Sequence, residues 1–197
     1  MKNEQLKELV LQSLEHEMGG VAVYTAALAC AKDHGLKEEW TKYLEETRTH
    51  VQKLQGVCRA MGLNPEEQTP GRKILRELGA SLVTAMKTAQ HGGDADAAQL
   101  VACECVVLAE TKDHLDWELL TQCAEKLTGA EGQALQEACK EIEDQEDEHF
   151  YHTKGWCREL WLKSLGLKSV LPPPEERKHV KTAIAAARAE HAAHPHK

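Results

Sequence analysis

Aromatic side chains are scarce in this chain: Phe, Trp and Tyr make up only 4% of its 197 residues, with a single Phe. β-Sheets are enriched in aromatic and β-branched residues, whereas Ala, Leu, Glu and Lys favour helices. Because those four residue types are abundant here, the composition predicts an all-α protein. A chain of this length is enough for one good-sized hydrophobic core and too short for two comfortable domains.

Long uncharged apolar runs are missing as well. The longest, Val101–Ala109, is interrupted by Glu104 and is much shorter than the roughly 20 residues of a membrane span. The first eight residues contain no apolar segment of the kind found in signal peptides. We therefore expect no membrane association and a cytoplasmic location.

Positive charge is outnumbered: 24 Lys and Arg stand against 32 Asp and Glu, which gives a formal net charge of −8. This balance disfavours nucleic acids and anionic membranes as partners. The seven cysteines are odd in number and irregularly spaced, so we expect reduced thiols rather than disulfides. The chain also has no Gly-rich phosphate loop, nucleophile elbow or Cys-x-x-Cys motif.

Apolar residues recur every three or four positions in several segments, which is the spacing of an amphipathic helix. We expect four long helices, over residues 5–32, 36–61, 95–127 and about 132–165. Gly35 is expected to end the first of them, and Gly129 and Gly132 form the turn into the fourth. A shorter helix over 72–90 follows the breaks at Asn64-Pro65 and Thr69-Pro70 and is long enough to cross a bundle from end to end. Residues 1–168 should form the bundle and 169–197 a Pro-linked C-terminal helical arm with a His-containing tail.

The four long helices share one anomaly, a carboxylate at or beside the apolar stripe near mid-length: Glu17, Glu46, Glu110 and Glu146. A carboxylate buried without a partner costs several kcal/mol. Four of them in one core would repel one another and take up protons. Two divalent cations would bring their summed charge to zero, so this pattern predicts a dinuclear metal site.

Two histidines follow these acids on the expected inner faces. His149 stands three residues after Glu146, and His50 stands four after Glu46. A Glu-x-x-His pair facing the inside of a helical bundle is the ligand unit of carboxylate-bridged two-metal sites. Oxygen and imidazole donors suit iron, manganese or zinc, while the absence of a thiolate set disfavours a structural zinc site.

Depth along the helices tests whether these residues can meet, because an α-helix rises 1.5 Å per residue. The distances of Glu110 and Glu146 along their helices, counted from the turn that joins these helices, agree to about 3 Å. Glu17 and Glu46 differ by about 8 Å, whereas His50 matches Glu17 better. The half of the site formed by residues 95–165 is therefore the better supported one.

Several neighbours of these acids are candidates for supporting roles. Tyr24 lies two turns from Glu17 on the same stripe, where it is either a redox-active neighbour or a core side chain. His114, four residues after the third acid, repeats the spacing of Glu46 and His50, and we interpret this repeat either as chance or as a supporting contact rather than a ligand role. His16 is rotated by about 100° from Glu17 and is expected in solvent, and Asp147 is expected to point away from the site.

On these residues the chain resembles the ferritin-like superfamily of di-iron carboxylate proteins, nearest the small bacterial stress-associated ferritin-like proteins of the YciE/YciF kind. The resemblance covers about residues 5–165. It rests on His-Glu-Met-Gly-Gly around Glu17, Glu-Thr-Arg-Thr-His over 46–50, Ala-Glu-Thr-Lys-Asp-His over 109–114 and Glu-Asp-Glu-His over 146–149. It implies a four-helix bundle with a long helical crossover between the second and third long helices.

The resemblance also implies a ligand set: one Glu from the first and third long helices and a Glu-x-x-His from the second and fourth. The second helix departs from this, because Thr49 stands where the family has His, so either His50 replaces it with shifted geometry or one metal lacks its nitrogen ligand. The metals would lie about 3.5–4 Å apart, bridged by Glu46 and Glu146.

The function implied is binding of two iron ions and reduction of O2 or peroxide coupled to Fe(II) oxidation, in an oxidative-stress or metal-handling role. Three alternatives remain open: a manganese or zinc site, a non-enzymatic metal-binding or stress-protective bundle, and a scaffold whose acids are satisfied by histidines and water. A homodimer formed through the crossover helix or the C-terminal arm is compatible with the sequence.

Overall fold

The structure is a computed structural model that describes residues 3–168, and this part of the chain contains five helices and no strand. The helices are α1 (Asn3–Cys30), α2 (His34–Ala60), α3 (Pro70–His91), α4 (Ala95–Ala124) and α5 (Gly129–Ser164). The prediction of an all-α protein is confirmed. The expected C-terminal arm lies outside the described residues. Among the described helices, none combines the length and the apolar character needed to cross a membrane.

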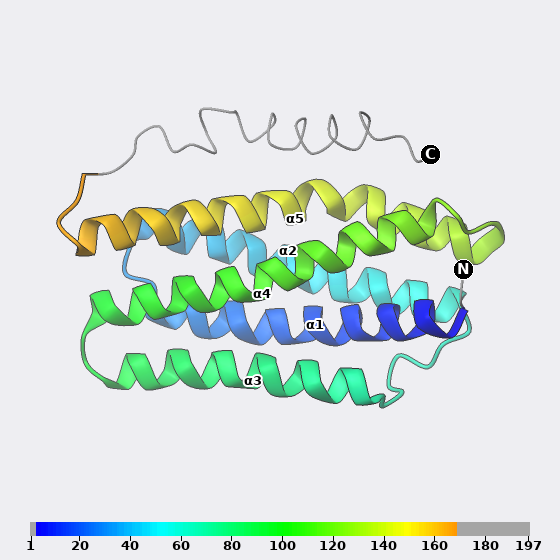
Figure 1. Cartoon of the computed structure of the whole chain (residues 1–197), viewed down its shortest axis with the longest axis horizontal. Helices are drawn as coiled ribbons and strands as arrows, with labels where there is room; N and C mark the ends of the chain where they lie inside the picture. The colour runs from blue at the N-terminus through cyan, green and yellow to red at the C-terminus, as the bar shows by residue number, and fades with distance from the viewer. Residues whose placement is uncertain (1–2, 169–197) are drawn as a thin grey trace.

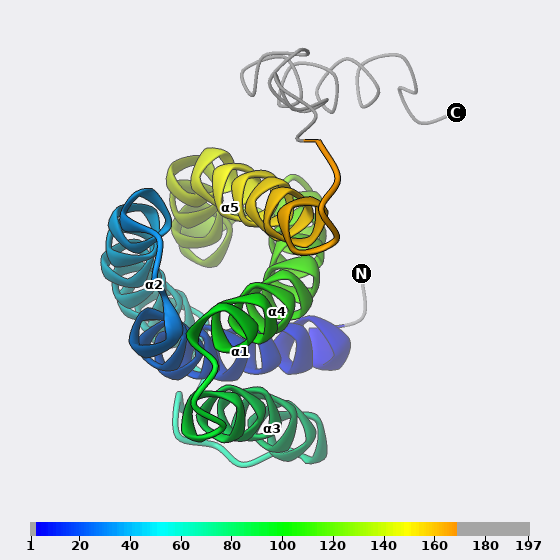
Figure 2. The ribbon, with the colours of Figure 1, turned by 90° about the vertical axis from the view of Figure 1, so that its left-hand side faces the viewer.

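Four of the helices form a ring in the order α1–α2–α5–α4, in which each helix contacts its two neighbours (Figure 2). Neighbours in the ring run antiparallel, and α2 and α4 run in the same direction (Figure 1). The helix α3 connects the end of α2 to the start of α4. It packs outside the ring, against α1 and α4. The expected crossover is therefore a full helix that covers one side of the bundle.

Local capping sets where the helices begin. The side chain of Asp33 accepts hydrogen bonds from the backbone amides of Gly35 and Leu36, so α2 starts at His34. Gly35 therefore lies in the first turn of α2, and the prediction that it ends the first helix is wrong. Thr69 caps α3 in the same way, with Pro70 in the first turn, where its missing N–H carries no cost.

One of the two adjacent glycines of α1 allows this helix to approach α2 closely, and α1 is continuous through both. A Cβ atom added at Gly20 would lie 3.2 Å from Cγ2 of Thr47 on α2, whereas a Cβ added at Gly19 would meet no atom within 4 Å. Gly20 therefore marks close helix packing, and neither glycine marks a bulge.

The buried apolar residues fall into two clusters that fill the two ends of the ring. One contains Leu36, Trp40 and Met86, and the other contains Leu14 and Ile142. On α1, α2, α4 and α5 alike, a short stretch near mid-helix belongs to neither cluster. The candidate metal ligands lie in these stretches, so the polar part of the core is enclosed between the two apolar clusters.

The buried face of α4 changes in character along the helix. Small residues, among them Ala102, Cys103 and Val106, come before the acids, and the large Trp117 and Leu120 come after them, whereas Leu108 and Leu115 are exposed. Small residues on this face leave room for the acidic side chains that α4 sends into the core.

A buried ion pair attaches α3 to α1. Nε of Arg72 donates to Oε2 of Glu15 at 2.9 Å, and its Nη1 donates to the carbonyls of Pro65 and Glu67. Arg76 binds the same carboxylate, but its side chain is half exposed. Glu15 thus faces two guanidinium groups, which balance its charge away from the rest of the acidic core.

These two arginines give a matched test of what holds α3 in place. We expect Arg72→Ala to lower the free energy of unfolding by at least about 2 kcal/mol, because buried carbonyls lose their donor and a void is left. Arg76→Ala should cost clearly less than Arg72→Ala, because solvent weakens an exposed ion pair. Urea unfolding followed by circular dichroism measures both, and equal losses would contradict the role given to Arg72.

Candidate metal centre

The first of two buried side-chain groups in the middle of the bundle joins α1, α2 and α5. Nδ1 of His50 lies 3.3 Å from Oε1 of Glu17 and 2.9 Å from Oε1 of Glu146. All three side chains are buried, and their ligand atoms lie within 4.8 Å of one another. This spacing is compatible with a single cation bound between them.

The second group joins α4 and α5 and shares one residue with the first. Nδ1 of His149 lies 3.8 Å from Oε2 of Glu110 and 3.5 Å from Oε1 of Glu146. These ligand atoms also fall within 4.8 Å of one another. Because Glu146 belongs to both groups, two cations bound there would be neighbours with one carboxylate between them.

Two of these carboxylates each accept a hydrogen bond from an aromatic side chain. Nε1 of Trp117 donates to Oε1 of Glu17, and the Tyr24 hydroxyl donates to Oε1 of Glu110, both at 2.8 Å. The second oxygen of each acid is buried without a hydrogen-bond partner, and so are both oxygens of Glu146. Buried polar atoms are nearly always paired in native structures. The imidazoles of His50 and His149 lie near these oxygens, but even two protonated rings would not balance three ionised acids, so the group points to a further positive partner.

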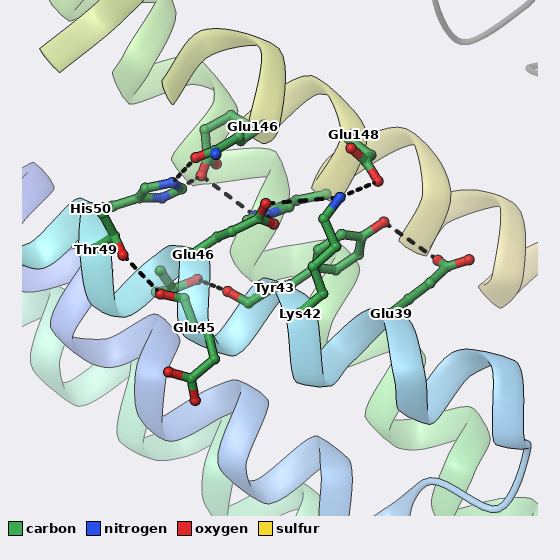
Figure 3. A network of polar contacts seen from close by, with 12 residues as sticks. Glu39, Lys42, Tyr43, Glu45, Glu46, Thr49, His50, Glu146 and Glu148 are labelled. Carbon is green, nitrogen blue, oxygen red and sulfur yellow. Dashed lines mark hydrogen bonds and ion pairs between the residues drawn. The ribbon is translucent and has the colours of Figure 1, made fainter. Parts of the chain in front are cut away.

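One ring nitrogen of each histidine faces the acids, as Figure 3 shows for His50 and Glu146. Nε2 of His50 lies 2.8 Å from Oε1 of Gln145, and Nε2 of His149 lies 2.9 Å from Oε2 of Glu46. In a neutral ring, an oxygen acceptor at Nε2 favours the proton there, so that Nδ1 would be the nitrogen able to bind a cation in place of a second proton. Metal-binding histidines are held in this way by a second hydrogen bond.

Glu46 occupies a different place from the other acids. It belongs to neither triad; its Oε2 contacts the far nitrogen of His149, and its Oε1 lies 3.8 Å from Nζ of Lys42. The arrangement is that of a carboxylate that orients a histidine, whereas the sequence predicted a bridging ligand. His50, in contrast, lies beside Glu17, as the depth count along the helices predicted.

Sequence analysis missed two further acids of α4. Asp113 and Asp116 are both buried, and Oδ1 of Asp113 has no hydrogen-bond partner. Asp116 pairs with Lys112. Asp113 follows Glu110 by three residues, and this spacing on the acidic face was the sign that could have identified it. Gln145 carried no comparable sign, because only the packing of α5 against α2 shows what it contacts.

Three neighbouring side chains differ from expectation or gain a definite partner. His16 is partly buried, with Nε2 3.0 Å from the carbonyl of Ala109, so its assignment to solvent is wrong. Asp147 belongs to neither triad, in line with the expectation, but it is buried, and its Oδ1 lies 2.7 Å from Nε2 of His114. The hydrogen bond of His114 therefore reaches the acid beside Glu146 rather than a candidate ligand.

The charges of the centre are strongly perturbed by burial. Burial, together with the charge of Glu146, raises the pKa of Glu110 well above its usual range. Burial also raises the pKa of Asp113, and the nearby Glu17 adds to this. For His50, burial opposes the charged form, but the adjacent carboxylates prevail and raise its pKa to about 11.

Comparison of the chain with protein-family models, with curated proteins and with solved structures finds no match in any of the three. Fold and site alone therefore define the class: an all-α bundle of five helices, within the described residues, whose core contains two adjoining groups of buried Glu and His able to hold metal.

The pKa shifts predict how the stability of the metal-free protein depends on pH. Glu110, Asp113 and His50 all have raised pKa values, so the folded state holds extra protons and loses stability as pH rises above the unfolded values. We expect the free energy of unfolding, measured in urea with a chelator, to fall by at least about 1.4 kcal/mol from pH 5.5 to 8.5. A flat or rising profile would contradict this.

Asp113 provides a sharper test of the same repulsion. Asp113→Asn removes a buried carboxyl group with raised pKa, so the metal-free protein should become more stable at pH 8 by about 1–3 kcal/mol. The control Asp96→Asn lies on the same helix as Asp113 and breaks an exposed ion pair with Lys32, so its effect on stability should be much smaller. Thermal unfolding with a chelator measures both variants.

Proposed function

We propose that this protein is a ferritin-like, di-metal carboxylate protein that binds two iron ions. The single observation that carries the proposal is Glu146, a buried residue shared by two Glu/His triads with neither oxygen hydrogen-bonded. In a protein core such a carboxylate requires either a proton or a cation. A position between two imidazoles and two further acids favours a pair of cations.

The two triads indicate which residues would bind each ion. Glu17 and His50 would hold one ion and Glu110 and His149 the other, with Glu146 between them. Glu46 would fix the ring of His149 through Nε2 and remain available as a further carboxylate. In this assignment His50 supplies the nitrogen ligand that Thr49 cannot supply.

Charge supports two divalent ions rather than one. Glu17, Glu46, Glu110 and Glu146 carry four negative charges when ionised, which two such ions neutralise. The donor set of carboxylates and imidazoles suits iron and manganese, and zinc is the redox-inert alternative. The seven thiols lie elsewhere: five are buried, two are partly buried, and none belongs to either triad.

The proposed reaction is reduction of O2 or peroxide coupled to Fe(II) oxidation, in oxidative-stress defence or metal handling. Bound iron would supply the electrons. The chain itself excludes water with the two apolar clusters on either side of the site. Tyr24 keeps a proton directed at Oε1 of Glu110, and Trp117 does the same for Glu17, so both acids are oriented by groups outside the triads.

The second candidate is a non-enzymatic metal-binding or stress-protective bundle. The observation that favours it is the burial of all five triad residues, each at most 3% exposed, which restricts the approach of any substrate larger than a diatomic molecule. Metal identity separates the two candidates, because bound zinc has no redox chemistry and would exclude the proposed oxidation.

The proposal predicts the effect of Glu146→Gln. Wild-type protein, purified without a His-tag, should bind two metal ions per chain, gain stability on binding, and oxidise Fe(II) faster than buffer after anaerobic loading. Glu146→Gln should bind fewer ions at least tenfold more weakly and lose the oxidation rate. The control Glu137→Gln, at an exposed position of the same helix, should behave as wild type. Two ions bound without accelerated oxidation would support the second candidate.

A further inference from the structure

The candidate centre is closed on most sides by its own surroundings. The two apolar clusters fill the bundle above and below it. On the side of α1 and α4, Trp117 and Tyr24 lie behind the acids, and α3 covers the outer surface of these helices (Figure 2). At the seam between α2 and α5, in contrast, an acid that contacts a triad residue is partly exposed to solvent.

One acid at this seam is partly accessible. The side chain of Glu46 is 19% exposed, whereas those of the five triad residues are at most 4% exposed. Its Oε2 contacts the buried ring of His149, and its Oε1 faces Nζ of Lys42 at 3.8 Å. Glu46 therefore connects the buried centre to the surface through a single carboxylate.

A cation of the protein already occupies this outer position. Nζ of Lys42 lies 2.7 Å from Oε1 of Glu148 on α5 and near Glu46 on α2, as Figure 3 shows. The side chain of Lys42 is 48% exposed, and an ion pair so open to solvent is weak. Two carboxylates that hold an ammonium group loosely can exchange it for another cation.

We propose that divalent cations reach the centre along the α2–α5 seam, bound first by Glu148 and Glu46, and that the Lys42 ammonium group competes with them for this path. This inference rests on the proposed function, since it gives the route by which that site is loaded. A hydrated cation would displace Lys42, and Glu46 would then turn from His149 to pass the cation inward. No bond is made or broken except ionic contacts.

The same seam contains a natural control. Lys53 of α2 pairs with Glu141 of α5, in an ion pair of the same kind that includes neither Glu46 nor a triad residue. Lys42→Gln and Lys53→Gln remove the same charge from the same helix. They differ in whether that charge lies at the proposed entrance.

The experiment measures loading of the full-length metal-free protein with Co²⁺ by stopped-flow absorption at low ionic strength. Lys42→Gln should load at least threefold faster than wild type, Glu148→Gln should load at least threefold slower, and Lys53→Gln should stay within twofold. All four proteins should reach the same number of bound ions. The differences should shrink as salt is added, because the steering is electrostatic.

Opposite changes in loading rate for Lys42→Gln and Glu148→Gln distinguish an entrance for cations from a purely structural ion pair. If the pair only stabilised the fold, both variants would shift loading in the same direction, and that result would overturn the proposal. Equal acceleration by Lys42→Gln and Lys53→Gln would also overturn it. Wild-type protein that takes up no Co²⁺ or Fe(II) at equilibrium would overturn the proposed function and the entrance together.

Discussion

The structure depends on one constraint, the burial of carboxylates that lack sufficient positive charge. Two hydrogen bonds, from Trp117 and Tyr24, satisfy one oxygen each of Glu17 and Glu110, and the remaining oxygens face one another and two imidazoles. A metal-free core of this kind must retain protons that the unfolded chain would release. The buried carboxylates that reduce the stability of the metal-free protein are also the groups that would bind cations.

The rest of the bundle serves to keep these acids together and dry. Apolar clusters fill the ring on both sides of the acidic layer. The helix α3 covers the flank of α1 and is attached by the buried guanidinium group of Arg72, which neutralises Glu15 separately from the centre. Close approach at Gly20 draws α1 against α2, and this packing helps to bring Glu17 to His50.

The acids of the centre divide into an inner and an outer set. Glu17, Glu110 and Glu146 are fully enclosed, whereas Glu46 extends from the ring of His149 to the ammonium group of Lys42. A carboxylate in this position can orient a ligand from inside and receive a cation from outside. The departure from Glu-x-x-His spacing in α2 is consistent with this division, because the nitrogen facing Glu17 comes from His50, one turn further along.

The sequence by itself determined the elements and most of their inner faces. Helical periodicity placed all five helices and marked Glu17, Glu110, Glu146 and both histidines as inward, because the pattern within one helix fixes which face is buried. It did not give the partners of these residues. The contacts of Gln145 with His50, Trp117 with Glu17 and Glu46 with His149 cross between helices, and so do those of Arg72. Such contacts depend on the axial shift and rotation of one helix against another, which only the packed tertiary structure decides.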